Sequence, residues 1–162
     1  MRTVFRFPDP VNEVAARLVA TGVVIMSLAY LATGWVWVLA VLAYGFVARV
    51  ATGPTLSPLG QLVTRFIAPN LPLSERPVPG PPKRFAQGIG AVLSSVALAA
   101  HLLGSSGTAL VLVAMITVAA SLEAAVAFCL GCKIFAGLIR LGIVPQTVCE
   151  ACSDLSKRPV LT

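Results

Sequence analysis

Four apolar stretches, each close to the length of a membrane-crossing helix, constrain this chain more than any other feature. They cover about residues 11–32, 35–51, 85–104 and 108–130. An apolar run of about 20 residues forms a helix that spans the ~30 Å hydrocarbon core of a bilayer. Apolar residues make up 57% of the chain and charged residues only 11%, too few to cover the surface of a soluble domain. We therefore expect an all-α membrane protein whose four transmembrane helices form two hairpins.

The basic residues indicate on which side of the membrane each end of the chain lies. Lys and Arg are enriched in the cytoplasmic flanks of membrane helices. With four spans, all 12 Lys and Arg residues fall on the side shared by the two termini and the middle connection. The opposite side holds two uncharged turns, around residues 33–34 and 104–107. Both termini are therefore predicted to be cytoplasmic, and the net charge of +6 favours anionic lipid over nucleic acid as a partner.

Three further segments lie outside the predicted spans. Residues 55–68 place apolar side chains at helical spacing, which predicts a short amphipathic helix in the inner interface or packed against the bundle. The proline-rich residues 69–84 predict an extended cytoplasmic connector. Beyond the fourth span the apolar face continues to Leu141, so the helix either projects into the cytosol or bends, with Gly131 as the expected position of the bend.

All four cysteines lie at or beyond the end of the fourth span, in a tail of residues 129–155. They form two Cys-x-x-Cys pairs, Cys129 with Cys132 and Cys149 with Cys152. Residues three apart on a helix face the same way, so each pair presents two sulfurs together. In the reducing cytosol, such pairs favour dithiol–disulfide exchange or the carriage of sulfur as a persulfide over permanent disulfides.

The same cysteines also suit a metal site. Their C-x2-C-x16-C-x2-C spacing lies in the range of a four-thiolate zinc site, which would staple the tail to the end of the fourth span. An iron–sulfur cluster takes the same ligands, and an inert packing role is the third interpretation. Under thiol chemistry, Lys133 favours the thiolate of Cys132 and makes it the expected attacking group. Cys149 and Cys152 would then resolve or relay the exchange.

Glu123 is the one acidic residue deep within a predicted span. Charge inside a membrane is costly, so a partner is expected. At its depth Gln87 faces it, and Arg84 reaches it by snorkelling. A structural pair, or a protonated carboxyl bonded within the bundle, is favoured over a role as proton acceptor or gate beside the thiols. On an ideal helix Glu123 and Cys129 are about 240° apart, which also disfavours direct contact between them.

The remaining polar residues give no sign of hydrolytic or nucleotide chemistry. The sequence has no phosphate loop, no serine-type nucleophile motif and no carboxylate pair. His101 lies near the outer end of the third span, where we expect a hydrogen bond to a turn serine such as Ser105. The spans hold so few polar residues that a solute transporter lined by Glu123 is the least favoured function.

Three stretches together resemble a known family. They are F-P-D-P-V-N-E at 7–13, R-F-A-Q-G-I-G at 84–90 and F-C-L-G-C-K-I-F at 128–135. The chain resembles the bacterial integral-membrane family called domain of unknown function 4395, and its tail at 142–152 is similar to the actinobacterial branch. The resemblance implies the inner membrane of a bacterium and work beside a thioredoxin-like or rhodanese-like protein. Because members outside that branch can lack the tail pair, it also implies that the core activity rests on Cys129 and Cys132.

The predicted function is therefore exchange of electrons or sulfur with a cytoplasmic thioredoxin-like or sulfurtransferase partner. Cys129 and Cys132 would form the primary dithiol. The supporting residues would be Lys133, Glu123, Arg84 and Gln87. The alternative is a zinc-stapled membrane scaffold that docks a cytoplasmic partner and holds the metal through all four cysteines.

Overall fold

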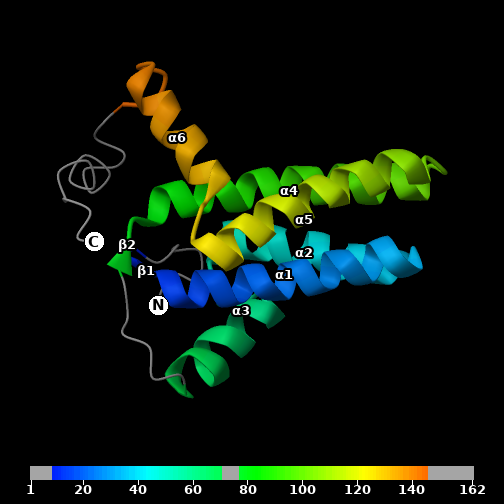
Figure 1. The fold of residues 1–162 in the computed structure, drawn as a ribbon, viewed down its shortest axis with the longest axis horizontal. Helices are drawn as coiled ribbons and strands as arrows, with labels where there is room; N and C mark the ends of the chain where they lie inside the picture. The colour runs from blue at the N-terminus through cyan, green and yellow to red at the C-terminus, as the bar shows by residue number, and fades with distance from the viewer. Residues whose placement is uncertain (1–8, 71–76, 146–162) are drawn as a thin grey trace.

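The computed structural model describes residues 9–70 and 77–145, and most of these are helical. Four helices form an antiparallel bundle (Figure 1), namely α1 (Glu13–Thr33), α2 (Val36–Thr52), α4 (Gly80–Leu102) and α5 (Ser106–Val126). Short turns join α1 to α2 and α4 to α5, and the two hairpins meet where α2 packs on α4 and α1 packs on α5. The prediction of an all-α fold is confirmed.

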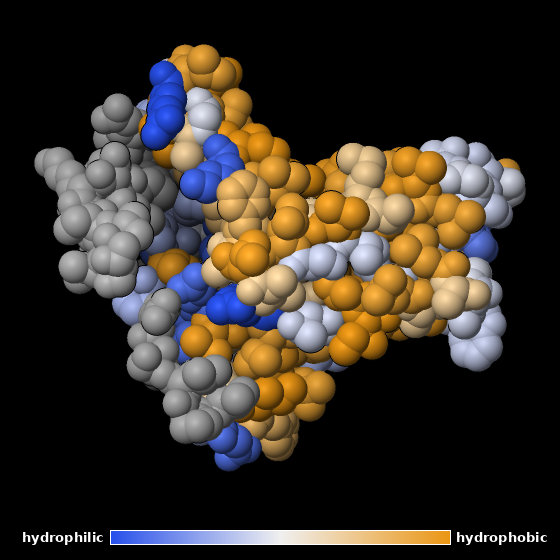
Figure 2. Space-filling model, viewed as in Figure 1, coloured by the Kyte–Doolittle hydropathy of each residue, from blue (hydrophilic) through white to orange (hydrophobic). Residues whose placement is uncertain are grey.

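The four helices differ in length. With 21, 23 and 21 residues, α1, α4 and α5 are long and apolar enough to cross a membrane, and α2 is a shorter apolar helix of 17 residues. At ~1.5 Å per residue, α2 measures about 26 Å. Figure 2 shows the hydrophobic surface that follows from this composition along the shaft of the bundle, with the most hydrophilic residues gathered toward one end and mainly weakly polar residues at the other.

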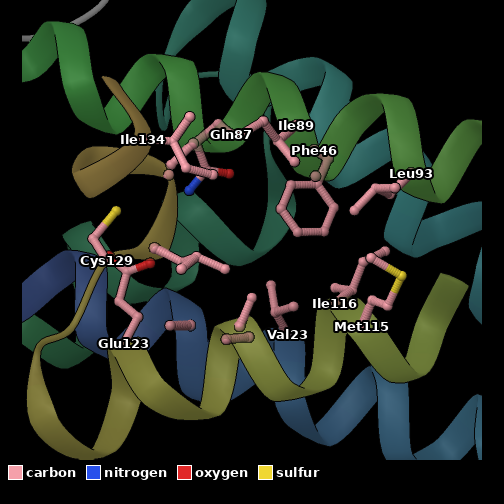
Figure 3. Close-up of a pocket in the computed structure, with 17 residues that line it drawn as sticks. Val23, Phe46, Gln87, Ile89, Leu93, Met115, Ile116, Glu123, Cys129 and Ile134 are labelled. Carbon is pink, nitrogen blue, oxygen red and sulfur yellow. The ribbon is translucent and has the colours of Figure 1, made fainter. Parts of the chain in front are cut away.

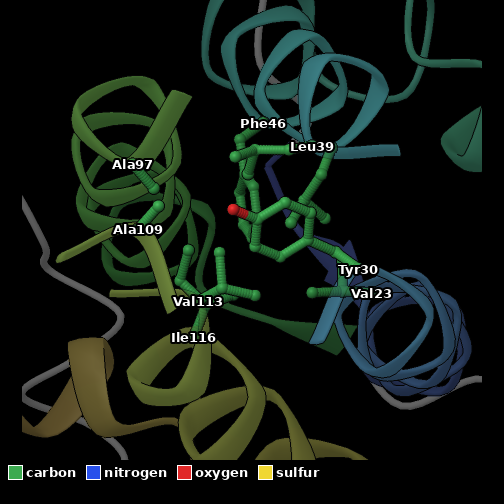
Figure 4. Packing of buried hydrophobic residues seen from close by; sticks show 9 residues of the cluster. Val23, Tyr30, Leu39, Phe46, Ala97, Ala109, Val113 and Ile116 are labelled. Atoms are coloured by element: carbon green, nitrogen blue, oxygen red, sulfur yellow. The ribbon is translucent and has the colours of Figure 1, made fainter. Parts of the chain in front are cut away.

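That end, where α1 and α4 begin and α2 and α5 end, is called the charged end below. No Asp, Glu, Lys or Arg occurs in residues 18–48 or 85–122, so the opposite end, with its two turns, carries no such residue. It is called the turn end. Between the two ends lies a core of aromatic and small aliphatic side chains (Figure 4), in which Tyr30, Leu39 and Val113 are almost fully buried. Close packing of this kind holds apolar helices together where lipid is the solvent.

The first turns of α1 and α4 are tied together at the charged end. The Asn12 side chain caps α1 by accepting a hydrogen bond from the Val14 amide at 2.9 Å. The short strands β1 (Val11–Asn12) and β2 (Pro77–Val78) pair antiparallel, with Val11 opposite Val78. α4 begins at Gly80, because prolines fit the first turn of a helix, so the connector is shorter than the expected residues 69–84.

Two helical segments diverge from the bundle at the charged end (Figure 1). One is α3 (Pro58–Leu62), continued by a π-helical turn, Val63–Ile67, and a 3-10 turn, Ala68–Asn70. The other is α6 (Leu130–Arg140). α3 and its continuation bury Val63 against α1 while Leu62 and Phe66 stay exposed, which is the pattern expected of an interfacial amphipathic helix.

The chain leaves the bundle at Ala127, and the expected bend at Gly131 is wrong. Ala127 adopts the left-handed conformation, with φ of 56°, and ends α5. Its amide and that of Phe128 fold back onto the carbonyls of Glu123 and Leu122. Gly131 lies inside α6, where the absence of a side chain allows close packing against α4.

Candidate functional site

The first cysteine pair lies where α6 begins. Cys129 is the N-cap of α6 and Cys132 stands in its first turn, with 5.2 Å between their Cα atoms. The two sulfurs are joined as a disulfide, and the Cys132 amide lies 3.3 Å from the Cys129 sulfur, to which it donates. The pair thus occupies a helix N-terminus, where free amides and the helix dipole favour negative charge. A thiolate formed here on reduction would be stabilised in the same way.

Close packing against α4 fixes the position of this pair. A methyl group on Gly131 would lie 2.5 Å from the Ala86 Cβ, so only glycine allows the two helices to approach this closely. One turn further along α6, Phe135 is buried against Phe85, with 5.4 Å between the ring centroids. The glycine between the two cysteines therefore serves the contact between α4 and α6.

Cys129 faces the interior of the bundle. It is 8% exposed and lines a cavity of about 240 Å³ between α1, α2, α4, α5 and α6. Figure 3 shows Cys129 and Glu123 at one end of this cavity, with Phe46 and Met115 toward the other. The expected angle of about 240° between Glu123 and Cys129 assumed one continuous helix. The break at Ala127 removes that assumption and brings both residues to the same cavity.

Glu123 forms an ion pair with Lys83, not with the expected Arg84 or Gln87. The Lys83 ammonium contacts the Glu123 carboxylate, and both side chains are largely buried, at 11% and 15% exposure. Gln87 lines the same cavity as Glu123, while Arg84 donates a hydrogen bond from Nε to the Val50 carbonyl. Lys83 is buried in the first turn of α4, whereas the next residue, Arg84, is exposed.

Arg49 is a buried cation, although in the sequence it is only one of the 12 basic residues. Its Nε donates to Gln87 Oε1 at 2.9 Å, its Nη1 donates to Ser57 Oγ at 3.2 Å, and its guanidinium lies 4.6 Å from the centroid of the Phe46 ring. Arg49 is only 6% exposed. The signal was present in the sequence, because Arg49 falls inside the apolar run that forms the second helix.

A third cation completes the polar layer at the charged end. The Arg17 guanidinium donates to the Ala124 and Ala125 carbonyls at 2.9–3.1 Å. These carbonyls lie in the last turn of α5, where intrahelical partners are missing. Arg17 on α1 thereby stabilises the end of α5, immediately before the break that leads to Cys129.

The turn end contains one buried polar contact. The Tyr30 hydroxyl and His101 Nδ1 lie 2.8 Å apart and form a hydrogen bond that joins α1 to α4. The expected partner of His101, Ser105, instead lies 2.9 Å from Thr108 through their hydroxyl groups. Tyr30 is 1% exposed, so this contact belongs to the core.

The other predicted site residues are placed as follows. Lys133 is exposed on α6, and its ammonium lies 5.8 Å from the centroid of the Phe128 ring. Cys149 and Cys152 lie outside the described residues. Within residues 9–70 and 77–145, no three His, Cys, Asp or Glu side chains come together as metal ligands. Cys129 and Cys132 alone supply two thiolates, so a closed zinc site needs two further ligands.

The three stretches that carry the family resemblance meet at the charged end. Asp9 accepts a hydrogen bond from the Gly80 amide at 3.0 Å, just before the second stretch begins. Ala86 of the second stretch packs against Gly131 of the third stretch. Gly90, also in the second stretch, leaves room for the Phe46 ring. Residues that are far apart in the sequence therefore build one packed unit around the first cysteine pair.

Comparison with known proteins identifies one family. The model of the family described as Domain of unknown function (DUF4395) matches residues 11–140, most of the chain. No curated protein and no solved structure matches. The matched range covers every helix described above and includes Cys129 and Cys132, while Cys149 and Cys152 lie beyond it. The chain belongs to the DUF4395 family.

Proposed function

We propose that this protein crosses the inner membrane of a bacterium with four helices and both termini in the cytoplasm, and exchanges electrons or sulfur through Cys129 and Cys132. The observation that carries the proposal is the position of this pair. A Cys-x-x-Cys disulfide occupies the N-terminus of α6, at the end of the bundle that holds all the described Lys and Arg residues. By the distribution of basic residues, that end faces the cytoplasm.

The step exchanges one bond for another. Oxidation of the two thiols forms the Cys129–Cys132 bond and releases two electrons and two protons, which reduce a disulfide of the partner to two thiols. In the sulfur-transfer version, a persulfide on one cysteine is attacked by the thiol of the other. That attack forms the same disulfide and releases the terminal sulfur as hydrogen sulfide. The partner is a cytoplasmic thioredoxin-like protein or sulfurtransferase.

The two cysteines have different roles in this proposal. Cys132 is half-buried and adjoins the exposed Lys133, whereas Cys129 is buried against the cavity. Cys132 therefore exchanges with the partner, and Cys129 resolves the mixed disulfide from inside. Cys129→Ser should trap a mixed disulfide between Cys132 and a thioredoxin-like partner, and Cys132→Ser should trap none. Trapping by Cys132→Ser alone would reverse the two roles.

A redox titration of the full chain in detergent tests the function itself. Thiols are alkylated and counted by mass after equilibration in dithiothreitol buffers of increasing reducing power. In the double variant Cys149→Ser/Cys152→Ser, which keeps only the first pair, two thiols should appear on reduction and disappear on oxidation, reversibly. Lack of a reversible couple in this variant would contradict the proposal.

Metal analysis of the same reduced preparations decides between this function and the zinc-stapled scaffold. A disulfide cannot ligate zinc, since only the thiolate binds the metal. The scaffold requires about one zinc per chain, thiols that resist alkylation until a chelator is added, and loss of the metal in both Cys129→Ser and Cys149→Ser. Metal-free protein with a reversible first pair would leave the redox function as the answer.

A further inference from the structure

A second cavity lies at the charged end, and it shares Lys83 with the ion pair. It measures about 210 Å³ and is enclosed by the beginnings of α1 and α4, the end of α2, and α3 with its continuation. Among the described residues that line it, two are cations and none is acidic. The polar side chains that line it are Asn12, Arg49, Thr64, Lys83 and Gln87.

The charges around this cavity do not cancel. Lys83 is paired with Glu123, so that ion pair is neutral as a unit. Within residues 9–70 and 77–145, the hydrogen-bond partners of Arg49 are both neutral, the amide oxygen of Gln87 and the hydroxyl of Ser57. Its Nη2 is buried and, within the described part of the chain, has no hydrogen-bond partner. Glu123 also attracts the Arg49 guanidinium through space, so among the described residues two cations share one carboxylate, and Arg49, Lys83 and Glu123 together carry a net charge of +1.

Such an arrangement is costly unless something else supplies the negative charge. A buried ion without a counter-charge loses its hydration and gains little in return, at a cost of several kcal/mol. Arginine presents its donors in a planar fork that matches the spacing of oxygens on phosphate and related groups. A cavity lined by an arginine that has an unused donor, in surroundings of net positive charge, fits an oxyanion.

We propose that this cavity binds one oxyanion of the phosphate or sulfate type, held by Arg49 and attracted by the net positive charge of Arg49, Lys83 and Glu123. Its oxygens accept from Arg49 Nη2. The group has two possible sources, a free inorganic oxyanion or the phosphate of an anionic phospholipid. Both are reasonable at this depth, because the cavity lies where α3 diverges from the bundle (Figure 1), at the end that the basic residues place near the inner headgroups. The site uses neither cysteine and does not rest on the redox function.

The first arm of the test uses free anions. Thermal unfolding of the full chain in non-ionic detergent is followed while inorganic phosphate or sulfate replaces chloride at constant ionic strength. The unfolding midpoint should rise and saturate in the wild type, because a ligand that binds the folded state stabilises it by mass action. The rise should be absent in Arg49→Gln. It should persist in Arg65→Gln, which removes the same charge from an exposed position on the continuation of α3.

The second arm uses lipid. The same three proteins are placed in nanodiscs of phosphatidylcholine or of phosphatidylglycerol, and native mass spectrometry records the lipids that stay bound. Retention of one phosphatidylglycerol by the wild type and Arg65→Gln, and not by Arg49→Gln, identifies a phospholipid as the source. Saturation with inorganic phosphate and no retained phosphatidylglycerol identifies a free oxyanion.

Two further variants keep the test decisive. If Arg49→Gln does not fold, Arg49→Lys retains the charge and loses the forked donors, and its affinity for the anion should fall about tenfold, the effect of one charge-assisted hydrogen bond. Cys129→Ser should bind the anion like the wild type, so failure of the redox function leaves this result intact. Equal responses of the wild type, Arg49→Lys and Arg65→Gln, or no saturable response in either arm, would overturn the proposal.

Discussion

The two ends of the bundle are built on the same four helices and differ in what they bury. The turn end joins its helices by uncharged turns and buries one polar contact, between Tyr30 and His101. The charged end buries the Lys83–Glu123 ion pair and Arg49, and it holds two cavities and the cysteine pair. The turn end shows that apolar packing and short turns suffice to close this bundle. The buried charge at the other end therefore exceeds what helix packing requires, which is why we assign function there.

The largest effect should come from breaking the ion pair. Glu123→Gln leaves the Lys83 ammonium buried without a counter-charge, and the free energy of unfolding should fall by about 3 kcal/mol. Unfolding in mixed micelles of increasing dodecyl sulfate content measures this loss. The double variant Lys83→Met/Glu123→Met should recover most of it, because an apolar pair of similar volume avoids the desolvation cost. Additive losses in the double variant would mean that the pair is not the reason for the effect.

Gly131→Ala tests whether the close approach of α6 to α4 matters at the charged end. The new methyl group collides with Ala86, and overpacking of this kind costs about 2 kcal/mol. We expect lower stability and a slower alkylation or exchange at Cys132, measured on the reduced protein. Gly137→Ala is the matched control on the same helix, since a Cβ there meets nothing within 4 Å. It should be neutral or stabilising, and equal effects at the two glycines would contradict the packing argument.

A smaller effect is expected at the turn end. Tyr30→Phe removes the hydroxyl that joins α1 to α4 and should lower the free energy of unfolding by about 1 kcal/mol, the usual net value of one hydrogen bond. The anion response and the redox couple should not change. A loss as large as that of Glu123→Gln, in the same micelle titration, would remove the energetic contrast between the ends.

The smallest effect concerns the break before the cysteine pair. Ala127 has φ of 56°, a conformation that costs an alanine about 1 kcal/mol and a glycine almost nothing. Ala127→Gly should therefore leave stability unchanged or raise it by less than about 1 kcal/mol, because glycine also gains entropy in the unfolded chain. Ala127→Val, in which a β-branched side chain meets the same φ, should lower stability. Equal stability of the two variants would show that the backbone at Ala127 can change conformation without cost.

The fold was accessible from the sequence because its determinant is composition. Long apolar stretches separated by turns define helices, and the uncharged turns at residues 33–34 and 104–107 define the hairpins without any tertiary information. The residues at which the helices begin and end were harder to predict. α4 begins at Gly80 within a segment that its prolines marked as extended, since proline is excluded from helix interiors but favoured in the first turn.

The sequence was enough to name residues of the candidate site, but not to predict which of them contact one another. Cysteine spacing pointed to Cys129 and Cys132, and the isolated acid pointed to Glu123. Pairing depends on which way each side chain points, and that depended on the first turn of α4 and on a break at Ala127. An alanine in the left-handed conformation carries no local signal, because glycine and asparagine are the residues that normally mark such a position. Glu123 and Cys129 line the same cavity because of that break, and the sequence did not predict it.

The divergence of α3 and α6 gives the molecule a wedge-shaped outline, narrow at the turn end and broad at the charged end (Figure 1). A wedge in a bilayer displaces more lipid from one leaflet than from the other. In the membrane orientation proposed above, the leaflet that surrounds the broad end would have to make room for two more helical segments. One is α3 with its continuation, which exposes Leu62 and Phe66, and the other is α6, which exposes Leu130 and Ile134. Lateral pressure and lipid shape in that leaflet would then act on the two elements that lie beside the cationic cavity and the cysteine pair.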